Sequence, residues 1–539
     1  MKKSISFLAC LLLAITAGAQ QPQADSLEQY VNKVMAEWKI PGMAVAIEKD
    51  GKVLFCNGFG VKELQGAVPF GDKADMIYPP CANPDKGIFV DEHTLFQIGS
   101  TSKSFTGALM AELVDEGKVS WEDTVKNILP DFEMYDPWVT ANMQVKDIMT
   151  HRFGIAEQAG TYIPNLGYDR DDIYRMFKYL KPAYSFRGDF QYSNIAFEIG
   201  ARIIEKVTGK SWEENVRERI FDKIGMSDSR TGGRAFAAAA NAAVPHDWGF
   251  RGDSMYVVPE YGPEQALWWL TQVNPEGGVN CSVTDLLKWA EFHMNGGKTP
   301  DPNGQPGDSV QVISARQMNY LHKGQTIAAQ TDDRLLLYAQ GWYVEQTSKG
   351  RVYYHTGTTW GFTTLCFFIP QMKLAGAILV DAETSSNPRF AIMRRAIDMF
   401  SGRPAEDYSP EWLAEWYSDR RAEAAKKAEA NANLPAEDSV PAPEPSPVSI
   451  CGKYTNDSLF GDAEVSVEKG KAFITIGKQG WKHPMKHEKG SEYSFRSDGH
   501  EFRITFSIDS GTGEAASFHI DWGYQEPFPD WTRNHLTRE

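Results

Sequence analysis

Ser100 and Lys103 form a Ser-x-x-Lys pair at the point where a helix is expected to begin. A spacing of three places both side chains on one helical face, so the lysine can hydrogen-bond the serine oxygen. A buried lysine with a depressed pKa can take the serine proton and activate a nucleophile, and the helix N-terminus favours a developing oxyanion. The alternative is an N-cap serine followed by a surface lysine. A second pair, Ser466 and Lys469, shows that the pattern also arises by chance.

A second candidate group is Tyr192-Ser193-Asn194, directly before another expected helix. A tyrosine near a lysine can act as a base and then as an acid toward the leaving group. The Asn194 amide can orient the lysine and bind a carbonyl of the acyl group. The alternative is a packed loop tyrosine.

A third candidate group is His355-Thr356-Gly357-Thr358, at the end of an expected strand. Glycine at this position lets a substrate backbone approach closely. The Thr358 amide can pair with that of Ser100 as an oxyanion hole. The alternative is an ordinary strand-end histidine.

In this order, the three groups resemble the motifs of the serine β-lactamase and penicillin-binding-protein superfamily. The resemblance is to the class C-like branch, with its esterase and D-aminopeptidase relatives, which uses Tyr where class A enzymes use Ser. Further similar stretches are 148–155, 224–229, 277–282 and Gly341-Trp342. The resemblance covers residues 25–400. It implies an α+β fold in which an antiparallel sheet flanked by helices adjoins an all-helical subdomain, with the site between them.

The resemblance also implies a role for each matching residue. Ser100 would be the acylated nucleophile, Lys103 its proton partner, and Tyr192 the general base and acid. Substrate would be bound by Asn194, His355, Thr356, Gly357 and Thr358. His355 stands where β-lactamases and many penicillin-binding proteins have lysine, and histidine is mostly neutral at pH 7. This departure is typical of the esterase- and peptidase-like relatives.

The resemblance implies a serine hydrolase that cleaves carboxylic esters or D-amino-acid peptides or amides through an acyl-enzyme on Ser100. One alternative is an acyltransferase that passes the acyl group to an alcohol or amine acceptor, including a sterol-like alcohol. Two others are a β-lactamase and a catalytically dead peptide-binding sensor. The expected partner is a small-molecule acyl donor whose identity the sequence leaves open.

Composition argues against nucleic acid, metals and organic cofactors as binding partners. The 539 residues carry a net charge of −16 and are 42% hydrophobic, which indicates a globular protein that repels nucleic acid. No CxxC pair or other metal-ligand spacing is found, so neither a metal nor an organic cofactor is expected. Cys56 and Cys81 are the first pair to test for a disulfide. The oligomeric state is left open.

The first residues predict a secretory signal peptide. Lys2 and Lys3 form a positive start, residues 7–15 form an apolar run, and residues 17–19 form a small-x-small cleavage site. The run is too short to span a bilayer, and Cys10 lies too early in it to favour lipidation. We therefore expect a periplasmic or secreted protein after cleavage near Ala19.

Hydrophobic periodicity predicts the elements that position these residues. A helix over 26–38 is followed by strands at 43–47 and 53–55 around Asp50-Gly51, a hairpin signal. Further helices are expected at 100–116, 138–150, 194–208, 212–220 and 282–294, and late strands at 338–345, 351–355, 363–369 and 374–380. Early and late strands with helices between them predict an α+β core whose sheet is closed from both chain ends.

The chain divides into four expected segments: a signal peptide (1–19), the hydrolase domain (20–402), a helical and proline-rich linker (403–448) and a small antiparallel β domain (449–539). Within the linker a helix is expected over 410–432. Residues 61–91 are expected to form an inserted loop near the rim of the pocket. Trp248, Trp268 and Trp269 either line an apolar pocket or pack the core.

Overall fold

The computed structural model describes residues 25–64, 68–69, 88–251, 254–259, 264–305, 307–347, 350–383, 387–432, 446–456, 460–497, 500–521 and 531–533. The expected signal peptide, most of the loop 61–91 and the proline-rich part of the linker lie outside these residues. Over the described ranges, no helix combines the length and apolar character needed to cross a membrane.

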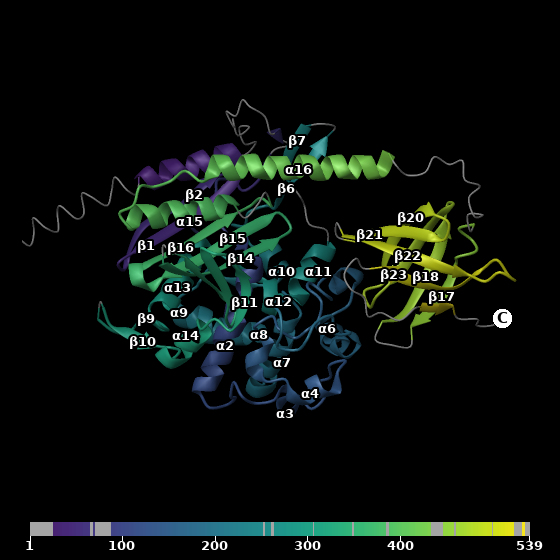
Figure 1. The fold of residues 1–539 in the computed structure, drawn as a ribbon, viewed down its shortest axis with the longest axis horizontal. Helices are drawn as coiled ribbons and strands as arrows, with labels where there is room; N and C mark the ends of the chain where they lie inside the picture. The colour runs from purple at the N-terminus through teal and green to yellow at the C-terminus, as the bar shows by residue number, and fades with distance from the viewer. Residues whose placement is uncertain are drawn as a thin grey trace, which may run out of the picture.

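An eight-stranded antiparallel sheet forms the centre of the hydrolase domain (Figure 1). Its strands, in spatial order, are β11 (Thr326–Gln330), β12 (Arg334–Tyr338), β13 (Tyr343–Thr347), β14 (Gly350–Thr359), β15 (Phe362–Ile369), β16 (Leu374–Val380), β1 (Gly42–Lys49) and β2 (Lys52–Gly60). The expected hairpin joins β1 and β2, with Asp50 and Gly51 both at positive φ. Since β1 also pairs with β16, the predicted α+β sheet closed from both chain ends is confirmed.

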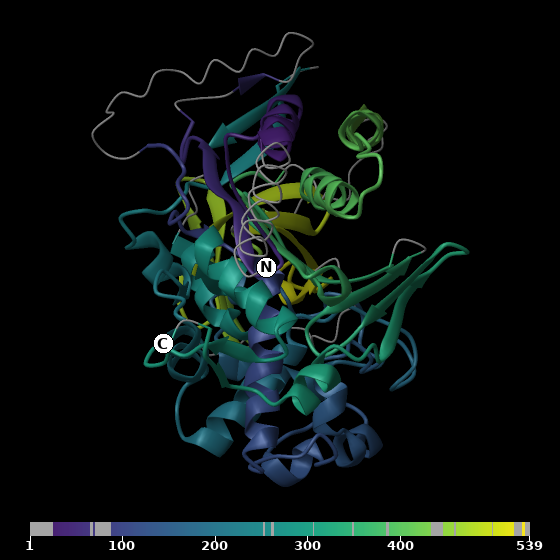
Figure 2. The ribbon, with the colours of Figure 1, turned by 90° about the vertical axis from the view of Figure 1, so that its left-hand side faces the viewer.

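Helices cover both faces of this sheet. On one face lie the helix over residues 25–38, α15 (Asn387–Phe400) and α16 (Ser409–Ala432), which Figure 2 shows together on one side. Trp38 and Trp416 pack there with ring centroids 5.6 Å apart, and Trp38 Nε1 donates to Ser409 Oγ. The helices expected over 26–38 and, in the linker, over 410–432 are thus confirmed and lie side by side, whereas α15 was not predicted.

The other face carries α13 (Val283–Met294) and α2 (Lys103–Asp115), beyond which lies a helical subdomain (Figure 1). The remaining helices are α3 (Val125–Ile128), α4 (Pro137–Asn142), α5 (Val145–Ile148), α6 (Arg170–Met176), α7 (Ala196–Thr208), α8 (Trp212–Val216), α9 (Asp222–Ile224), α10 (Gly233–Ala237), α11 (Glu264–Gln272), α12 (Asn274–Gly277) and α14 (Ala315–Leu321). Every α2 residue from Lys103 to Leu113 is buried. The helix that follows the candidate nucleophile is therefore enclosed by its neighbours, which include α7, α8, α12 and α14.

Three small sheets complete the domain. They are β3 (Val68–Pro69) with β7 (Ser254–Pro259) and β6 (His246–Arg251), β4 (Phe96–Gln97) with β8 (Val279–Cys281) and β5 (Arg230–Thr231), and β9 (Lys298–Pro300) with β10 (Ser309–Gln311). β4 leads directly into the Ser100 turn, and its pairing with β8 fixes where that turn begins.

Three sequence predictions are corrected. The single helix expected at 138–150 is two helices, because a capping box of Gln144 and Asp147 starts α5 anew. The helix expected at 212–220 ends as α8 at Val216 and continues as a π-helical turn. The single strand expected at 338–345 is wrong, because a tight turn with Gly341 at positive φ separates β12 from β13.

The C-terminal β domain is a closed antiparallel barrel, visible beside the hydrolase domain in Figure 1. Its strands are β17 (Gly452–Asn456), β18 (Gly461–Glu468), β19 (Lys471–Ile476), β20 (Trp481–Lys489), β21 (Glu492–Ser497), β22 (His500–Ile508), β23 (Ala515–Asp521) and β24 (Trp531–Arg533). Phe502, Ile504 and Phe506 alternate into its interior, as predicted. Aromatic contacts such as that between Tyr454 and Phe518 fill the interior.

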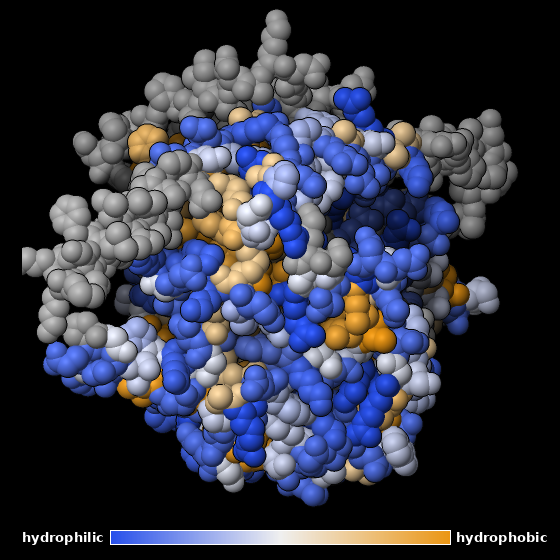
Figure 3. All heavy atoms as spheres, turned by 60° about the vertical axis from the view of Figure 1, so that its left-hand side comes forward, coloured by the Kyte–Doolittle hydropathy of each residue, from blue (hydrophilic) through white to orange (hydrophobic). Residues whose placement is uncertain are grey.

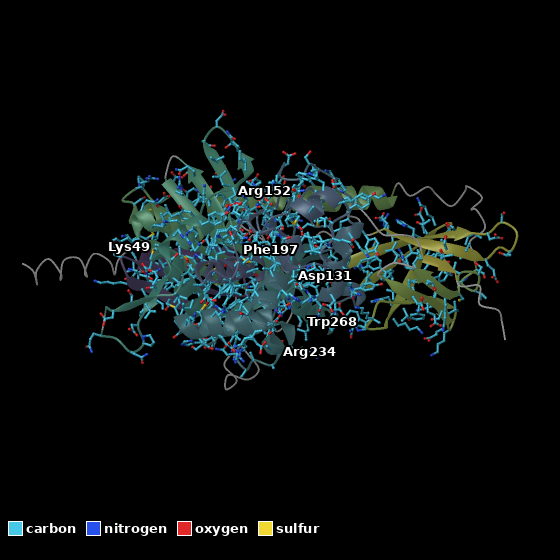
Figure 4. All side chains as sticks on the ribbon, turned by 90° about the horizontal axis from the view of Figure 1, so that it is seen from below. Lys49, Asp131, Arg152, Phe197, Arg234 and Trp268 are labelled. Atoms are coloured by element: carbon cyan, nitrogen blue, oxygen red, sulfur yellow. The ribbon has the colours of Figure 1, made fainter. Side chains whose placement is uncertain are left out.

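The barrel contacts the segment that precedes α6. Tyr168 Oη donates to Phe460 O, and Lys478 lies 3.0 Å from the Asp169 carboxylate. Gly477 lies so close that a Cβ there would be 1.7 Å from Leu166 O. Trp268, which Figure 4 shows on the side toward the barrel, packs edge-on against Trp481. The barrel is therefore attached directly to the helical subdomain.

The tryptophans and cysteines have mixed roles. Trp248 packs against Trp416 on the sheet, while Trp269 packs against Trp360 at the end of β14. Cys56 is a free thiol 3.7 Å from Thr284 Oγ1, and Cys81, its expected partner, lies outside the described residues.

The face in Figure 3 is mostly hydrophilic, with apolar side chains in small separate groups.

Candidate active site

Ser100 lies in the 3-10 turn η2 (Gly99–Ser102), directly ahead of α2. Gly99 has a φ of 49°, and a Cβ at this position would lie 2.7 Å from Thr358 N and 2.8 Å from Thr358 O. The main chain of Thr358 therefore faces the Ser100 turn. Ser100 is half-buried and Thr358 is exposed, so this side of the site is accessible.

Lys103 is fully buried, and its ammonium group donates three hydrogen bonds. Its Nζ donates to Ser100 Oγ at 3.0 Å, to Asn194 Oδ1 at 2.6 Å and to Glu276 O at 2.9 Å. Burial lowers the pKa of Lys103 to about 7, against the opposing charge of Glu276. The predicted Ser-x-x-Lys contact is thus present, with a lysine that can lose its proton near neutral pH.

Tyr192 lies beside the lysine, whose Nζ is 4.9 Å from the ring centroid. Burial raises the pKa of Tyr192 above its usual range, while a hydrogen bond with Ser100 lowers it. His151 stacks on the ring at 4.3 Å and accepts the Ser193 N–H through Nδ1. Burial holds the pKa of His151 well below its usual range, so the ring that stacks on Tyr192 is neutral.

Asn194 is fixed by the loop ahead of η3 (Ile163–Leu166). Its Nδ2 donates to Gln158 Oε1 at 2.8 Å and to Thr161 Oγ1 at 3.3 Å. Because both donors of the amide are used, its oxygen points to Lys103. Asn194 therefore accepts from the lysine without adding charge. Both of its amide hydrogens are used within the protein, so the expected bond to an acyl carbonyl would need one of these contacts to break.

The third motif lies on the part of β14 that extends beyond its pairing with β13. His355 Nδ1 donates to Thr356 O and its Nε2 accepts from Tyr338 Oη at 2.9 Å. Burial, with a smaller contribution from the charge of Lys103, lowers the pKa of His355 to about 3. The histidine is thus neutral at pH 7, as expected from its departure from lysine.

Gly357 lets β14 approach the Ser100 turn. A Cβ there would lie 1.8 Å from Ile98 O. Buried Arg389 of α15 donates to Gly357 O at 2.9 Å and also to Thr364 O on β15. The absence of a side chain at Gly357 and the hydrogen bond from Arg389 therefore both allow β14 to lie close to the Ser100 turn.

The structure brings all of the predicted motifs to one place, since Ser100, Lys103, Tyr192 and Asn194 are linked by direct contacts and β14 adjoins the same turn. Sequence reasoning missed five supporting residues: His151, Gln158, Glu276, Tyr338 and Arg389. His151 lies in one of the stretches that resemble the family. Glu276, Tyr338 and Arg389 are buried and Gln158 is half-buried, and no local spacing marks any of these four.

Comparisons with known proteins agree with this geometry. The unguisins hydrolase ungD' of Aspergillus campestris is 27% identical over 474 residues, covering 83% of this chain and 78% of that protein. Penicillin-binding protein 4 of Amycolatopsis lactamdurans is 23% identical, covering 71% and 92%. The octameric penicillin-binding protein homologue from Pyrococcus abyssi aligns over 94% of this chain and 99% of its own, with a TM-score of 0.57 and 19% identity. The Beta-lactamase family model matches residues 27–398. The chain therefore belongs to the Beta-lactamase family, and the relatives named above are a hydrolase and penicillin-binding proteins.

Proposed function

We propose that this protein is an exported serine hydrolase that cleaves carboxylic esters or D-amino-acid peptides or amides through an acyl-enzyme on Ser100. The observation that carries the proposal is the contact of buried Lys103 with Ser100 Oγ at 3.0 Å. Such a contact is what a nucleophile needs for activation by an adjacent base.

Lys103, rather than Tyr192, is the better candidate for the first base. The pKa of Lys103 is lowered to about 7, while burial keeps the Tyr192 phenol protonated at neutral pH. The neutral amine takes the Ser100 proton as Ser100 Oγ attacks the acyl carbonyl. The Tyr192 phenol, next to Ser100 and Lys103, is placed to give its proton to the leaving group while it takes up the proton that Lys103 received from Ser100, so that the amine and the phenol are both restored.

The oxyanion would form between the amides of Ser100 and Thr358. Support comes from the Thr358 main chain, which faces the Ser100 turn. Two such donors aimed at the developing charge supply several kcal/mol of transition-state stabilisation. Water then releases the acyl group from Ser100.

Neutral His355 favours esters and peptides over β-lactams. It supplies no positive charge for a substrate carboxylate, since its pKa is lowered to about 3. The name of one relative, an unguisins hydrolase, supports hydrolysis. Acyl transfer is the second candidate, because Trp269 and Trp360 pack at 4.3 Å beside the end of β14 and offer an aromatic wall for an apolar alcohol.

The test is intact-protein mass spectrometry of the chain exposed to a fluorophosphonate, short acyl esters, a D-alanyl peptide and a penicillin. We expect a mass increment on the wild type that Ser100→Ala abolishes. Ser466→Ala is the matched control, because it removes the serine of the other Ser-x-x-Lys pair and should label normally. Added alcohols separate transfer from hydrolysis. A folded wild type that no probe labels would instead indicate a peptide-binding sensor.

A further inference from the structure

His151 contacts the tyrosine motif of the site through both its ring and its main chain. It is fully buried, and its ring stacks on that of Tyr192 with centroids 4.3 Å apart and an interplanar angle of 29°. Its Nδ1 accepts the Ser193 N–H at 3.0 Å, and its main-chain oxygen accepts the Gln191 N–H at 2.8 Å. One residue therefore holds the main chain on both sides of Tyr192 as well as the ring between them.

The main chain of His151 is in a conformation that few residues adopt. Its φ is 56°, in the left-handed region, where histidine is more frequent than most other residues that carry a side chain. Glycine would adopt this φ without strain. Strain of this kind persists where the surrounding structure enforces it, and it is concentrated at functional sites. The presence of a side chain at this position therefore indicates that the side chain is needed.

The protonation of the imidazole follows from its hydrogen bond. Because Nδ1 is an acceptor, the ring is neutral and carries its proton on Nε2. In the part of the chain that the structure describes, Nε2 has no hydrogen-bond partner. Burial also holds the pKa of His151 well below its usual range. The ring therefore acts on Tyr192 through its position and not by exchanging a proton.

The same ring connects the second motif to the third. The ring centroid of Tyr338 also lies 4.3 Å from that of His151, and Tyr338 Oη donates to His355 Nε2 at 2.9 Å. Phe190 packs edge-on against His151 with centroids 5.4 Å apart. The Tyr192 ring is thus packed against a continuous group of rings that reaches β14, and His151 is the member that stacks on it.

We infer that His151 is a positioning residue that holds the Tyr192 phenol where it can protonate the leaving group. The inference rests on the proposed function, in which the phenol O–H bond breaks as the leaving oxygen gains the proton, and the phenol regains a proton from the Lys103 ammonium. A displaced phenol would slow this transfer. Attack by Ser100 on the acyl carbonyl, with Lys103 as the base, would remain.

The choice of leaving group separates these two steps. p-Nitrophenyl acetate expels a stabilised phenolate that needs no proton, whereas phenyl acetate expels a more basic phenolate whose departure a proton assists. Both esters form the same acetyl-enzyme on Ser100, so the ratio of their kcat/KM values reports on acylation. A merely structural role of His151 would lower both values by the same factor and leave the ratio unchanged.

The test variant is His151→Asn. The asparagine Oδ1 can replace Nδ1 as the acceptor of the Ser193 N–H, and asparagine tolerates a positive φ, so the change mainly removes the ring that stacks on Tyr192. We expect kcat/KM for phenyl acetate to fall about fivefold more than kcat/KM for p-nitrophenyl acetate. A folded His151→Asn protein whose ratio equals that of the wild type overturns the inference.

Two further variants calibrate this readout. Tyr192→Phe removes the phenol and should change the ratio at least as much, and adding His151→Asn to it should change the ratio no further. His293→Asn is the matched control, because His293 is also a buried histidine packed on a ring, that of Trp289 at 4.3 Å, but it lies near the end of α13. Its ratio should equal that of the wild type.

The remaining outcomes are also decisive. If His151→Asn does not fold, Phe190→Leu replaces it, since it removes the half-buried ring that packs on His151. We expect the ratio to change in the same direction by about twofold, and an unchanged ratio overturns the inference. If the folded wild type cleaves neither ester and no fluorophosphonate labels Ser100, the proposed function fails and the inference falls with it.

Discussion

Lys103 Nζ lies closer to Asn194 Oδ1, at 2.6 Å, than to Ser100 Oγ, at 3.0 Å. The amide oxygen accepts the lysine but carries no charge, so it fixes the position of Nζ without stabilising the ammonium as a carboxylate would. This neutral contact is consistent with the lowered pKa of Lys103.

Asn194→Asp should therefore slow the labelling of Ser100 at neutral pH. The new carboxylate would raise the pKa of Lys103 from about 7 by a unit or more, so that labelling at pH 7 falls about fivefold and recovers above pH 8. The pH dependence of fluorophosphonate labelling checks this. Asn194→Ala serves as control, because it loosens the lysine without adding charge. Parallel profiles for the Asp and Ala variants would contradict the prediction.

His355 should make the fold sensitive to acid. The pKa of His355 is lowered to about 3 in the folded protein and is about 6.5 when unfolded. The unfolded chain therefore binds the proton first as the pH falls below 6.5, and the stability that His355 contributes above this pH is progressively lost. Between pH 6.5 and 4.5, wild type should lose about 2–3 kcal/mol more of its free energy of unfolding than His355→Gln. Urea denaturation at both pH values measures the difference, and equal losses would refute the expectation.

Gly357→Ala should disrupt the approach of β14 to the Ser100 turn. The new Cβ would lie 1.8 Å from Ile98 O, so the strand must move or the domain must unfold. We expect no Ser100 labelling and a lower melting temperature. Gly51→Ala, in an open hairpin turn with a φ of 76°, should cost only about 1–2 kcal/mol and should label normally. Normal labelling of a folded Gly357→Ala protein would show that the close approach is dispensable.

Gly477→Ala should detach the barrel from the helical subdomain. A Cβ there would lie 1.7 Å from Leu166 O, in the segment that follows Thr161, a contact of Asn194. We expect faster release of the barrel by limited proteolysis and slower Ser100 labelling. Gly480→Ala is the control, because it also has a positive φ but its Cβ would meet open space. Equal proteolysis rates for the two variants would count against a docked barrel.

The sequence was most informative where function depends on local spacing. Ser100 and Lys103 are three residues apart at an expected helix start, and this spacing, together with the other two motifs, predicts their contact. The alternation of Phe502 and Ile504 likewise predicts strand β22 and its buried face. Patterns of this kind are set within one turn or one strand.

Residues that act through the tertiary fold could not be found in this way. Glu276 lies far along the chain from Lys103, and nothing near it marks it as buried. Arg389 reads as an ordinary helical arginine, although it binds two strand carbonyls. The missed turn after Tyr338 has a different cause, since apolar residues continue on both sides of it and only Gln340 and Gly341 interrupt the run.

The placement of β1 between β2 and β16 has a consequence for how the protein is made. Gly42 N donates to Asp381 Oδ1 across 339 residues of sequence, at the start of the pairing between the first and last strands of the sheet. Nearly the whole hydrolase domain must be synthesised before β1 can pair with β16, its second neighbour in the sheet. Such long-range pairing slows folding and leaves strand edges unpaired meanwhile. The nascent chain should therefore depend on chaperones that keep β1 from pairing elsewhere until residue 380 has emerged.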